Sequence, residues 1–219
     1  MSKVLILTSP REAANLEEEL SQKQRFGLEF TKRALDLILA ILVGATTLLL
    51  LPFIALAIRL ESRGPILFRQ KRVGKDGDIF ELVKFRSTFR TAVDESVGWD
   101  KEEGEVYTKT GKFLRKNYFD ELPQVINVLR GEMSFIGPRP ERPEFVEILR
   151  REIPFYEMRL LIRPGLSGWA QINMDNDASA KDAAEKLQYD LYYLKYCSLW
   201  LDLKIALKTL AIILQREGK

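Results

Sequence analysis

The chain has 219 residues, with 34 Lys and Arg against 31 Asp and Glu, a net charge of +3, a single Cys and no His. Without His, and with Cys197 as its one cysteine, it cannot carry a Ser-His-Asp triad, a Cys-His pair, an internal disulfide or a multi-cysteine metal site. The chemistry left to it uses carboxylates, Lys, Arg, Tyr or an oxygen-bound cation such as Mg²⁺, and the small net charge indicates no nucleic-acid partner.

Residues 1–30 are predicted to form a small soluble appendage. Ser9, Pro10 and Glu12 are typical of a helix start, with Ser as the N-cap, Pro in the first position and Glu in the third. A polar helix is predicted from there to about Lys23. The segment contains no catalytic motif, so we assign it no chemistry.

A long uncharged segment follows at residues 37–58. Its roughly 22 residues would span about 33 Å as a helix, which is enough for the hydrocarbon core of a bilayer. Lys32 and Arg33 precede this segment, and Arg59 follows it. Because Lys and Arg beside membrane segments favour the cytoplasmic side, a crossing helix would leave one of these groups on the disfavoured side.

The charge pattern and a proline together predict a re-entrant membrane hairpin over residues 31–62. Pro52 removes a backbone donor within the apolar run, so a bend is expected there. The helix would enter one leaflet, bend and return, with the preceding cations at one lip and Arg59 at the other. Asp36 is expected at the interface, because a carboxylate in lipid is costly. The alternative is a single crossing helix with a proline kink.

Residues 63–219 are predicted to form a soluble domain beside this segment. Two β-prone stretches, 65–72 and 78–85, flank an Asp-Gly turn and predict a hairpin. The polar residues 91–110 predict an irregular loop. The expected fold class is therefore α+β, a membrane-associated monotopic protein with a kinked re-entrant helix, a small hairpin and surrounding amphipathic helices.

An amphipathic helix is predicted over residues 120–130, because apolar residues recur there with i, i+3, i+4, i+7 spacing and Gly131 follows. Asp120 would be its N-cap and Glu121 its first helical residue. The unpaired N–H groups of the helix start could hold both carboxylates ionised beside a phosphate and a shared divalent cation. Taken alone, the two residues favour an acidic helix N-terminus without a catalytic role.

Several cations in this part of the chain are candidates for binding phosphate. Arg139 stands between Pro138 and Pro140, which stiffen the loop that presents its guanidinium. A rigid guanidinium suits bidentate phosphate binding, whereas a solvated Arg-Pro loop is the plain alternative. The candidate cations are Lys84, Arg86, Arg115, Arg139 and Arg163.

Six sequence blocks resemble, in order, the bacterial sugar transferase family, the monotopic phosphoglycosyl transferases that act on polyprenyl phosphate. The resemblance extends from about residue 31 to the C-terminus, and the DELPQ and GPRP motifs at this separation are its most specific part. The blocks are KRALDLILA at 32–40, GPILFRQKRVGKDG at 64–77, FELVKFRST at 80–88, DELPQVINVLRGEMSFIGPRP at 120–140, RPGLSGWAQIN at 163–173 and YDLYYLKYCSLWLDLKIALKT at 189–209.

The resemblance implies transfer of a sugar 1-phosphate from a UDP-sugar to undecaprenyl phosphate, with release of UMP, at the start of exopolysaccharide, O-antigen or glycoprotein glycan synthesis. In the family the Asp of DELPQ is the nucleophile and the Glu a Mg²⁺ ligand, which map to Asp120 and Glu121, with Asp120 also beside the metal. Asp120 would attack the β-phosphorus, and polyprenyl phosphate would then attack the aspartyl-phosphosugar. Residues 63–219 would form the catalytic domain on the cytoplasmic face of the bacterial inner membrane.

Other roles follow from the same resemblance. Gln124 would orient the metal shell, and Pro138 and Pro140 would shape the nucleotide site. Asp190 would lie behind the site or bind a neighbouring cation, with a structural ion pair as the alternative. Besides the UDP-sugar, polyprenyl phosphate and membrane lipids, downstream glycosyltransferases and a second copy of the chain are candidate partners.

The chain departs from the family pattern in three places. Tyr118-Phe119 stand where Ser-Leu is common, Thr88 replaces the Met of KFRSM, and residues 171–175 lack the usual Gly-Arg. Because the last change falls in a region that we associate with sugar or nucleotide recognition, the sugar stays unassigned.

The C-terminal residues 198–214 combine a broad apolar face with Trp200, Lys204 and Lys208, as an interfacial helix would. Packing of this helix against the protein core is the alternative. Two other functions are also open. Asp175 and Asp177 could form the D-x-D metal motif of a nucleotide-sugar glycosyltransferase, which is a weak signal, or the chain could be a non-catalytic membrane-associated scaffold.

Overall fold

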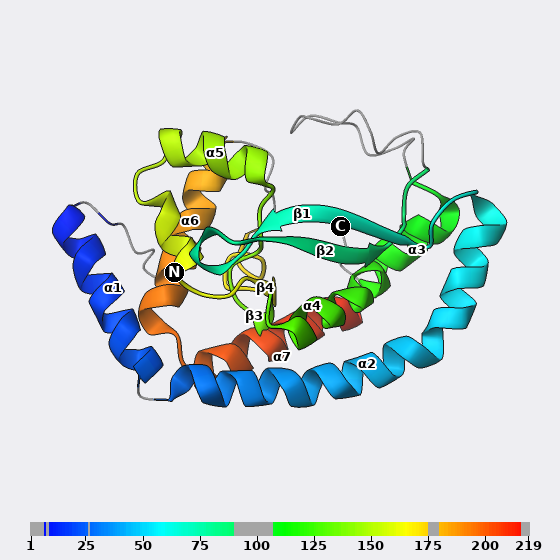
Figure 1. Cartoon of the computed structure of the whole chain (residues 1–219), viewed down its shortest axis with the longest axis horizontal. Helices are drawn as coiled ribbons and strands as arrows, with labels where there is room; N and C mark the ends of the chain where they lie inside the picture. The colour runs from blue at the N-terminus through cyan, green and yellow to red at the C-terminus, as the bar shows by residue number, and fades with distance from the viewer. Residues whose placement is uncertain (1–6, 8, 26, 90–106, 175–179, 216–219) are drawn as a thin grey trace.

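The computed structural model describes residues 7, 9–25, 27–89, 107–174 and 180–215 (Figure 1). Its helices are α1 (Pro10–Arg25), α2 (Leu28–Glu61), α3 (Lys109–Lys116), α4 (Val125–Arg130), α5 (Pro143–Glu152), α6 (Ala180–Tyr196) and α7 (Leu199–Gln215). The 3-10 turns are η1 (Lys75–Gly77), η3 (Phe119–Gln124) and η4 (Tyr156–Leu161), and the strands are β1 (Leu67–Val73), β2 (Ile79–Phe85), β3 (Ser134–Ile136) and β4 (Gly165–Ser167). The predicted α+β class is confirmed.

Helix α2 is the long apolar helix that the sequence predicts. Among the described residues it alone is long and apolar enough to cross a membrane, with a mean hydropathy of 2.6 in its 18-residue window. Only 11% of that window is buried, whereas the core helix of a soluble protein would be mostly buried. Pro52 lies inside α2 without ending it, and Figure 1 shows the helix running along the lower edge and turning upward toward its C-terminal end. The re-entrant topology stays a prediction.

One face of α2 packs on the domain near both ends. In its first half, Ala40 is fully buried against α4 and the residues that follow it. In its second half, Ile54 and Ile58 pack against Phe85 of β2 and Leu114 of α3. The opposite face exposes large apolar side chains, namely Leu37, Ile38, Leu39, Ile41, Leu42, Leu48, Leu49, Phe53, Leu56 and Leu60. The helix therefore lies against the domain and presents an unbroken apolar surface on its other side.

The predicted β-hairpin is confirmed. Strands β1 and β2 pair antiparallel from Leu67 opposite Phe85 to Val73 opposite Ile79. The turn η1 places Asp76 and Gly77 in the left-handed region, with φ angles of 57° and 88°. Asp and Gly are among the residues that tolerate this conformation best, which explains why Asp-Gly marks the turn.

A second, parallel pair of strands positions the GPRP loop. Strand β3 pairs with β4, and Gly137, which follows β3, donates its N–H to the Ser167 carbonyl at 2.9 Å. A side chain on Gly165 or Gly168 would collide with the backbone of Gly137. Glycine is required at these contacts because the two segments touch through their backbones, and the loop that carries Arg139 is thereby held against residues 164–168.

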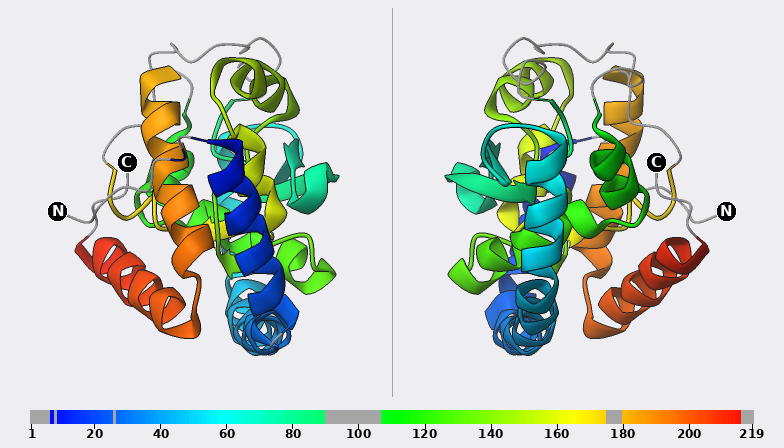
Figure 2. Two further views of the ribbon diagram at one scale, coloured as in Figure 1. Left: turned by 90° about the vertical axis from the view of Figure 1, so that its left-hand side faces the viewer. Right: turned by 90° about the vertical axis from the view of Figure 1, so that its right-hand side faces the viewer.

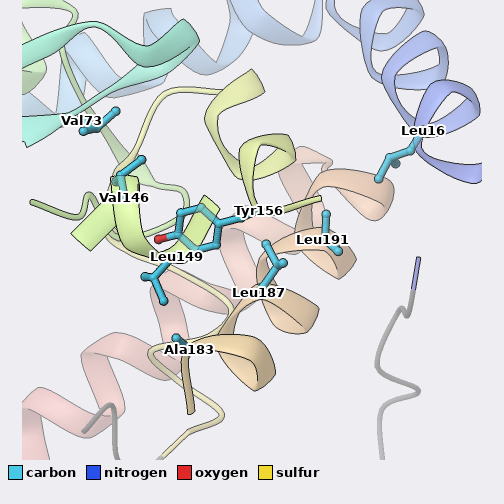
Figure 3. Close-up of a cluster of buried hydrophobic side chains, with 8 residues drawn as sticks. All are labelled: Leu16, Val73, Val146, Leu149, Tyr156, Ala183, Leu187 and Leu191. Atoms are coloured by element: carbon cyan, nitrogen blue, oxygen red, sulfur yellow. The ribbon is translucent and has the colours of Figure 1, made fainter. Parts of the chain in front are cut away.

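Helix α1 caps one end of the core. The predicted capping box is confirmed, because the Ser9 N–H donates to the Glu12 carboxylate at 3.2 Å and the Glu12 N–H donates to the Ser9 hydroxyl at 3.3 Å. Leu16 of α1 belongs to a buried cluster in which Tyr156 lies between side chains of α5 and α6 (Figure 3). The other members are Val73, Val146, Leu149, Ala183, Leu187 and Leu191.

Helix α7 packs against the protein core, which was the alternative prediction, and it also exposes an apolar face; its place at a membrane interface stays a prediction. Leu201 and Ile205 are buried in the core, so one face packs against the protein. The other face is exposed and apolar, and it consists of Trp200, Leu203, Leu207, Leu210 and Leu214. Figure 2 shows α7 and α2 both on the lower side of the molecule in its two views. The two helices that expose apolar faces therefore lie on the same side of the protein.

Two predictions about the middle of the chain are corrected or fall outside the structure. Helix α3 begins at Lys109, capped by the Thr108 side chain, so the end of the predicted loop 91–110 is helical. Residues 90–106, which make up most of that loop, lie outside the described residues, as does the D-x-D sequence at 175–177.

Candidate active site

The two adjacent carboxylates lie on a 3-10 turn and not at the start of an α-helix. Tyr118, in the left-handed region with φ 57°, is the N-cap of η3, and Asp120 and Glu121 occupy its first turn. The predicted N-cap role of Asp120 is therefore wrong. Pro123 has no N–H to donate to an α-helical bond, and the regular helix α4 begins only at Val125. The predicted C-terminal end of this helix is confirmed, because Gly131 is the C-cap of α4 with φ 83°.

Glu121 binds two cations through one oxygen. Its Oε1 accepts from Lys84 Nζ of β2 at 2.7 Å and from Arg139 Nη2 of the GPRP loop at 2.8 Å. Burial would raise the pKa of Glu121, but Arg139 and Lys84 hold it well below its usual range. We call Asp120, Glu121, Lys84 and Arg139 the dyad cluster. Three separate elements thus bring two carboxylates and two cations to one point.

Asp120 is less well compensated than its neighbour. Its residue surface is 7% exposed. Burial raises the pKa of the Asp120 carboxyl, and neighbouring Glu121 adds to this rise, whereas Lys84, Arg115 and Arg139 oppose it. The net rise means that the protein around Asp120 disfavours its charged form, which a further cation bound nearby would favour.

Arg115 lies at the edge of the dyad cluster. Its guanidinium donates to the Tyr107 hydroxyl and stacks over the Tyr107 ring, 4.3 Å from the ring centroid. It also lowers the pKa of Asp120, which shows that its charge acts on that carboxyl. The structure therefore brings three of the five predicted cations, Lys84, Arg139 and Arg115, to the carboxylate pair.

A buried group of charged residues holds the GPRP loop from behind. Arg159 Nη2 donates to the Arg139 carbonyl at 2.8 Å, and Arg72 Nη1 donates to the Pro140 carbonyl at 2.9 Å. Glu141, which follows the loop, forms an ion pair with Lys186 of α6 at 2.6 Å. We call Arg72, Glu141, Arg159, Lys186 and Asp190 the support cluster.

Asp190 belongs to this support cluster and forms the structural ion pair that was the alternative prediction. It is 1% exposed, and its Oδ2 lies 2.9 Å from Arg159 Nη2. The contact is an ion pair without good hydrogen-bond alignment at Oδ2. Burial would lower the pKa of Arg159, but Asp190, Tyr156 and Glu141 together raise it above its usual value. Arg159 therefore stays charged inside the protein.

Sequence reasoning missed four members of the support cluster, Arg72, Glu141, Arg159 and Lys186. One signal was available, because Lys186 and Asp190 are four residues apart and so share a face of one helix. That face is otherwise apolar, with Ala183, Leu187 and Leu191 buried beside the two charged residues. Charged residues on a buried helix face require partners, and the sequence did not show that the partners lie next to the GPRP loop.

Arg86 and Arg163, predicted as phosphate ligands, lie outside the dyad cluster. Arg86 is 4% exposed and donates to the backbone carbonyls of Ser62 and Arg63, so it fastens the end of α2 to β2. Arg163 Nη1 pairs with Glu29 near the start of α2 at 2.7 Å, and its Nε donates to a backbone carbonyl. The structure assigns both guanidinium groups to holding elements together.

The remaining predicted site residues are buried next to the dyad cluster or behind it. Gln124 is 1% exposed, and its Nε2 has no hydrogen-bond partner in the described part of the chain. Pro138 and Pro140 are buried and line a small pocket behind the loop together with Val73 and Val146. The roles proposed for these three residues in metal and nucleotide binding stay predictions.

The charged residues expected at the first membrane lip bind the protein instead. Lys32 Nζ donates to Asp202 Oδ2 at 2.6 Å. Arg33 donates to two backbone carbonyls at the end of α4. Asp36 is 5% exposed and accepts hydrogen bonds from β3, so the expectation that it faces the membrane interface is corrected. Pro52 and Arg59, in contrast, are exposed on the second half of α2.

A magnesium site was predicted at the carboxylate pair. Within the described ranges, no group of three or more His, Cys, Asp or Glu side chains converges as a metal site would require. Mg²⁺ is nevertheless often held by one or two carboxylates together with substrate phosphates. Asp120, whose charge is incompletely compensated, and Glu121 fit this donor set, although Lys84 and Arg139 already occupy one Glu121 oxygen.

Together, the fold and the site define a class of protein: an α+β domain on a long exposed apolar helix, with a carboxylate pair that faces cations suited to phosphate. The family model described as bacterial sugar transferase matches residues 27–216. The chain therefore belongs to the bacterial sugar transferase family, and the predicted family resemblance is confirmed.

Named relatives show the same similarity. The chain is 44% identical over 189 residues to a UDP-N-acetylgalactosamine-undecaprenyl-phosphate N-acetylgalactosaminephosphotransferase of Aeromonas hydrophila, covering 86% of this chain and 45% of that protein. It is 42% identical to the UDP-glucose:undecaprenyl-phosphate glucose-1-phosphate transferase of Escherichia coli K12, covering 81% and 39%. A transferase of the latter name from Caulobacter vibrioides is 38% identical, covering 89% and 73%. The chain thus spans less than half the length of the first two relatives.

Proposed function

We propose that this chain transfers a sugar 1-phosphate from a UDP-sugar to undecaprenyl phosphate, with UMP as the other product. Family membership and the names of the relatives support this reaction class. The observation that carries the proposal is the meeting of Asp120 and Glu121 with Lys84 and Arg139 at one point of the structure. Two cations beside two carboxylates can offset the charge of a pyrophosphate that approaches a carboxylate nucleophile.

The proposed reaction has two steps. An Asp120 oxygen attacks the β-phosphorus of the UDP-sugar, a new P–O bond forms, and the bond from this phosphorus to the bridging oxygen breaks to release UMP. An oxygen of undecaprenyl phosphate then attacks the same phosphorus, and the acyl phosphate bond to Asp120 breaks. The product is undecaprenyl-diphosphate-sugar, and Asp120 is regenerated as a carboxylate.

The chain's own residues have distinct parts in this scheme. Lys84 and Arg139 hold Glu121 ionised and would contact the phosphoryl oxygens, where charge accumulates in the transition state. Arg115 adds positive charge that favours the ionised form of Asp120. A bound Mg²⁺, held by Glu121 and Asp120, would supply further charge neutralisation at the pyrophosphate.

The same proposal places the enzyme on the cytoplasmic face of the bacterial inner membrane, with α2 as a re-entrant helix. Both ends of α2 are fastened to one domain, by Asp36 and β3 at the start and by Arg86 at the end. A straight crossing helix would separate its ends by the thickness of the bilayer core, about 30 Å. Fastening to a single domain supports a helix that stays in one leaflet, with α7 beside it at the interface.

The topology can be tested by cysteine labelling in a Cys197→Ser background. Phe30→Cys lies in the first turn of α2 at a residue that is 80% exposed, and Asp78→Cys lies in the exposed turn of the hairpin after the end of α2. A membrane-impermeant maleimide should label neither position from outside intact cells and both positions after permeabilisation. Labelling of one position in intact cells would establish a crossing helix.

The activity is tested by mixing the purified chain with undecaprenyl phosphate, Mg²⁺ and a panel of UDP-sugars. Release of UMP supports the proposal, and the sugar that gives it identifies the donor, which differs among the named relatives. Release of UDP would indicate a glycosyltransferase instead.

Asp120→Asn separates catalysis from binding in the same assay. The variant should lower UMP release by about 10³-fold or more, because it removes the nucleophile while keeping the shape of the side chain. Without lipid acceptor, the wild-type chain should retain radiolabel from a UDP-sugar labelled in its β-phosphate, and Asp120→Asn should retain none. If Asp120→Asn and Glu121→Gln both sustained glycan synthesis in cells, the chain would act as a scaffold.

A further inference from the structure

The start of α2 carries four charged residues, Glu29, Lys32, Arg33 and Asp36. Glu29 pairs with Lys75 and Arg163. The contacts of Arg33 and Asp36 lead to the two segments that carry the dyad cluster. One of these segments is η3 with its continuation α4, and the other is β3 with the GPRP loop that follows it. Lys32 contacts α6 and α7 instead.

Arg33 holds the end of the segment that begins with the carboxylate pair. Its Nη1 donates to the Val128 carbonyl at 2.6 Å and its Nη2 to the Leu129 carbonyl at 3.0 Å. These carbonyls belong to the last turn of α4, where backbone acceptors have no partner within the helix and attract a cation. Because α4 continues η3 without a break, this contact limits where η3 and the carboxylate pair can lie relative to α2.

Asp36 holds the strand that leads to Arg139. Its Oδ1 accepts from the Ser134 hydroxyl at 3.1 Å and from the Phe135 N–H at 3.0 Å. The Ser134 hydroxyl in turn accepts from the Ile136 N–H at 3.3 Å. A carboxylate that is 5% exposed would be costly without such donors, and the contact fixes β3 one residue before the GPRP loop begins.

Lys32 reinforces the same strand from its other side. Its Nζ donates to the Tyr193 hydroxyl at 2.8 Å and to Asp202 at 2.6 Å. The fully buried Tyr193 hydroxyl lies 3.5 Å from the Ile136 carbonyl, at the end of β3. The first turns of α2 therefore act on β3 directly through Asp36 and indirectly through Tyr193.

We propose that Arg33 and Asp36 are positioning residues that set Arg139 opposite Glu121, so that the membrane helix completes the active site as well as anchoring it. The inference rests on the proposed function and adds a role for α2 in the reaction. The 2.8 Å contact between Arg139 and Glu121 joins two segments that are otherwise both held on α2. A shift of either segment would lengthen that contact, and misplacement by about 1 Å can cost about 100-fold in rate.

Kinetics of UMP release by the full chain in phospholipid nanodiscs test this role. Asp36→Ala should lower kcat by about 10- to 100-fold and change KM for the UDP-sugar by less than about threefold, because alignment is lost while the substrate contacts remain. Asp36→Asn should recover most of kcat, since its Oδ1 can accept the same two hydrogen bonds. Unchanged kcat in Asp36→Ala, or equal losses in both variants, would overturn the proposal.

A matched pair of arginine variants tests the other contact. Arg33→Gln should lower kcat about 10-fold, whereas Arg130→Gln, which removes an exposed cation at the same end of α4, should leave it unchanged. Thermal unfolding and the membrane-bound fraction of each variant show whether a lower kcat merely reflects less folded or less membrane-bound protein. Equal rates for the two variants would contradict the role of Arg33.

Hydrogen exchange gives a second measurement that does not depend on the reaction. In Asp36→Ala, peptides that cover residues 134–141 should exchange at least about 10-fold faster than in the wild type, while peptides from α5 should not change. Unaltered exchange in residues 134–141 would refute the positioning role even if the wild type released no UMP. An inert wild type with accelerated exchange in the variant would refute the proposed function alone.

Discussion

The dyad cluster and the support cluster use the same residue types, carboxylates beside Lys and Arg, but they differ in how far their cations reach solvent. The side chains of Arg159 and Lys186 in the support cluster are 4% and 7% exposed, whereas those of Arg139 and Lys84 in the dyad cluster are 35% and 19% exposed. In the support cluster, burial would raise the pKa of Glu141, yet Lys186 and Arg159 lower it to about 2. Glu121 of the dyad cluster has a lowered pKa for the same reason, and each cluster also holds one carboxyl whose pKa burial raises, Asp190 and Asp120. A buried network holds a loop in place, whereas cations that reach solvent can contact a substrate phosphate.

The two clusters are joined through one residue. Arg139 offers its side chain to Glu121 in the dyad cluster and its carbonyl to Arg159 in the support cluster. In the proposed reaction, the support cluster would act by keeping the Arg139 backbone in place. Changes to the support cluster should therefore act mainly on stability, and changes to the dyad cluster mainly on rate.

The largest expected effect is on stability, from Asp190→Ala. Removing this carboxylate takes the closer ion-pair partner from buried Arg159 and leaves it only Glu141 at 3.8 Å, which should cost about 3–5 kcal/mol of unfolding free energy, or roughly 6–20 °C in melting temperature. Thermal unfolding followed by circular dichroism measures this. Glu144→Ala is the control, because its pair with Arg142 is solvent-exposed and should be worth less than about 1 kcal/mol. Similar melting temperatures for the two variants would refute a structural support cluster.

An intermediate effect, on rate, is expected from Arg139→Lys. Lysine keeps the charge but loses the planar fork of donors, so kcat/KM for UMP release should fall about 100-fold while the melting temperature changes little. Arg69→Lys, at an exposed ion pair on β1, should keep the wild-type kcat/KM. If Arg139→Lys had a much lower melting temperature but the wild-type kcat/KM below that temperature, Arg139 would have the structural role of the support cluster.

The smallest expected effect is a gain in stability from Asp120→Asn. Because the folded protein raises the pKa of Asp120, it disfavours the charged carboxylate, and this penalty is fully present at pH values above the folded pKa. The variant should therefore melt higher than the wild type at pH 7 with chelator present, by ~2–4 °C for each kcal/mol gained. The difference should shrink as the pH falls through the raised pKa of the folded state and vanish well below 3.8, the ordinary value, where Asp120 is neutral in both the folded and the unfolded chain. A lower melting temperature for Asp120→Asn at pH 7 would show that the carboxylate is fully paired.

Local sequence patterns predicted the elements whose cause is local. The Asp-Gly turn, the Ser9–Glu12 capping box and the Gly131 helix end each depend on the conformational preferences of a few adjacent residues, and each is present. The start of the helix at 120–130 was predicted wrongly, because Pro123 and the left-handed Tyr118 together favour a 3-10 turn that apolar spacing does not reveal. Helix α3 was not predicted, because its first two residues, Lys109 and Thr110, end the polar segment 91–110, which favours a loop.

The sequence by itself determined the long apolar helix, the carboxylate pair, the stiff loop of Arg139 and the family, because these are written in contiguous residues. Only the tertiary structure decided which cations act on the carboxylate pair. Lys84 and Arg139 contact Glu121, and the charge of Arg115 acts on Asp120. Arg86 and Arg163 instead fasten α2 to the domain. The tertiary structure also showed that Asp36 is buried against β3 and that Asp190 pairs with Arg159. The physical reason is that the partner of a charged group is set by the folded path of the chain, and residues distant in sequence cannot be paired from local spacing alone.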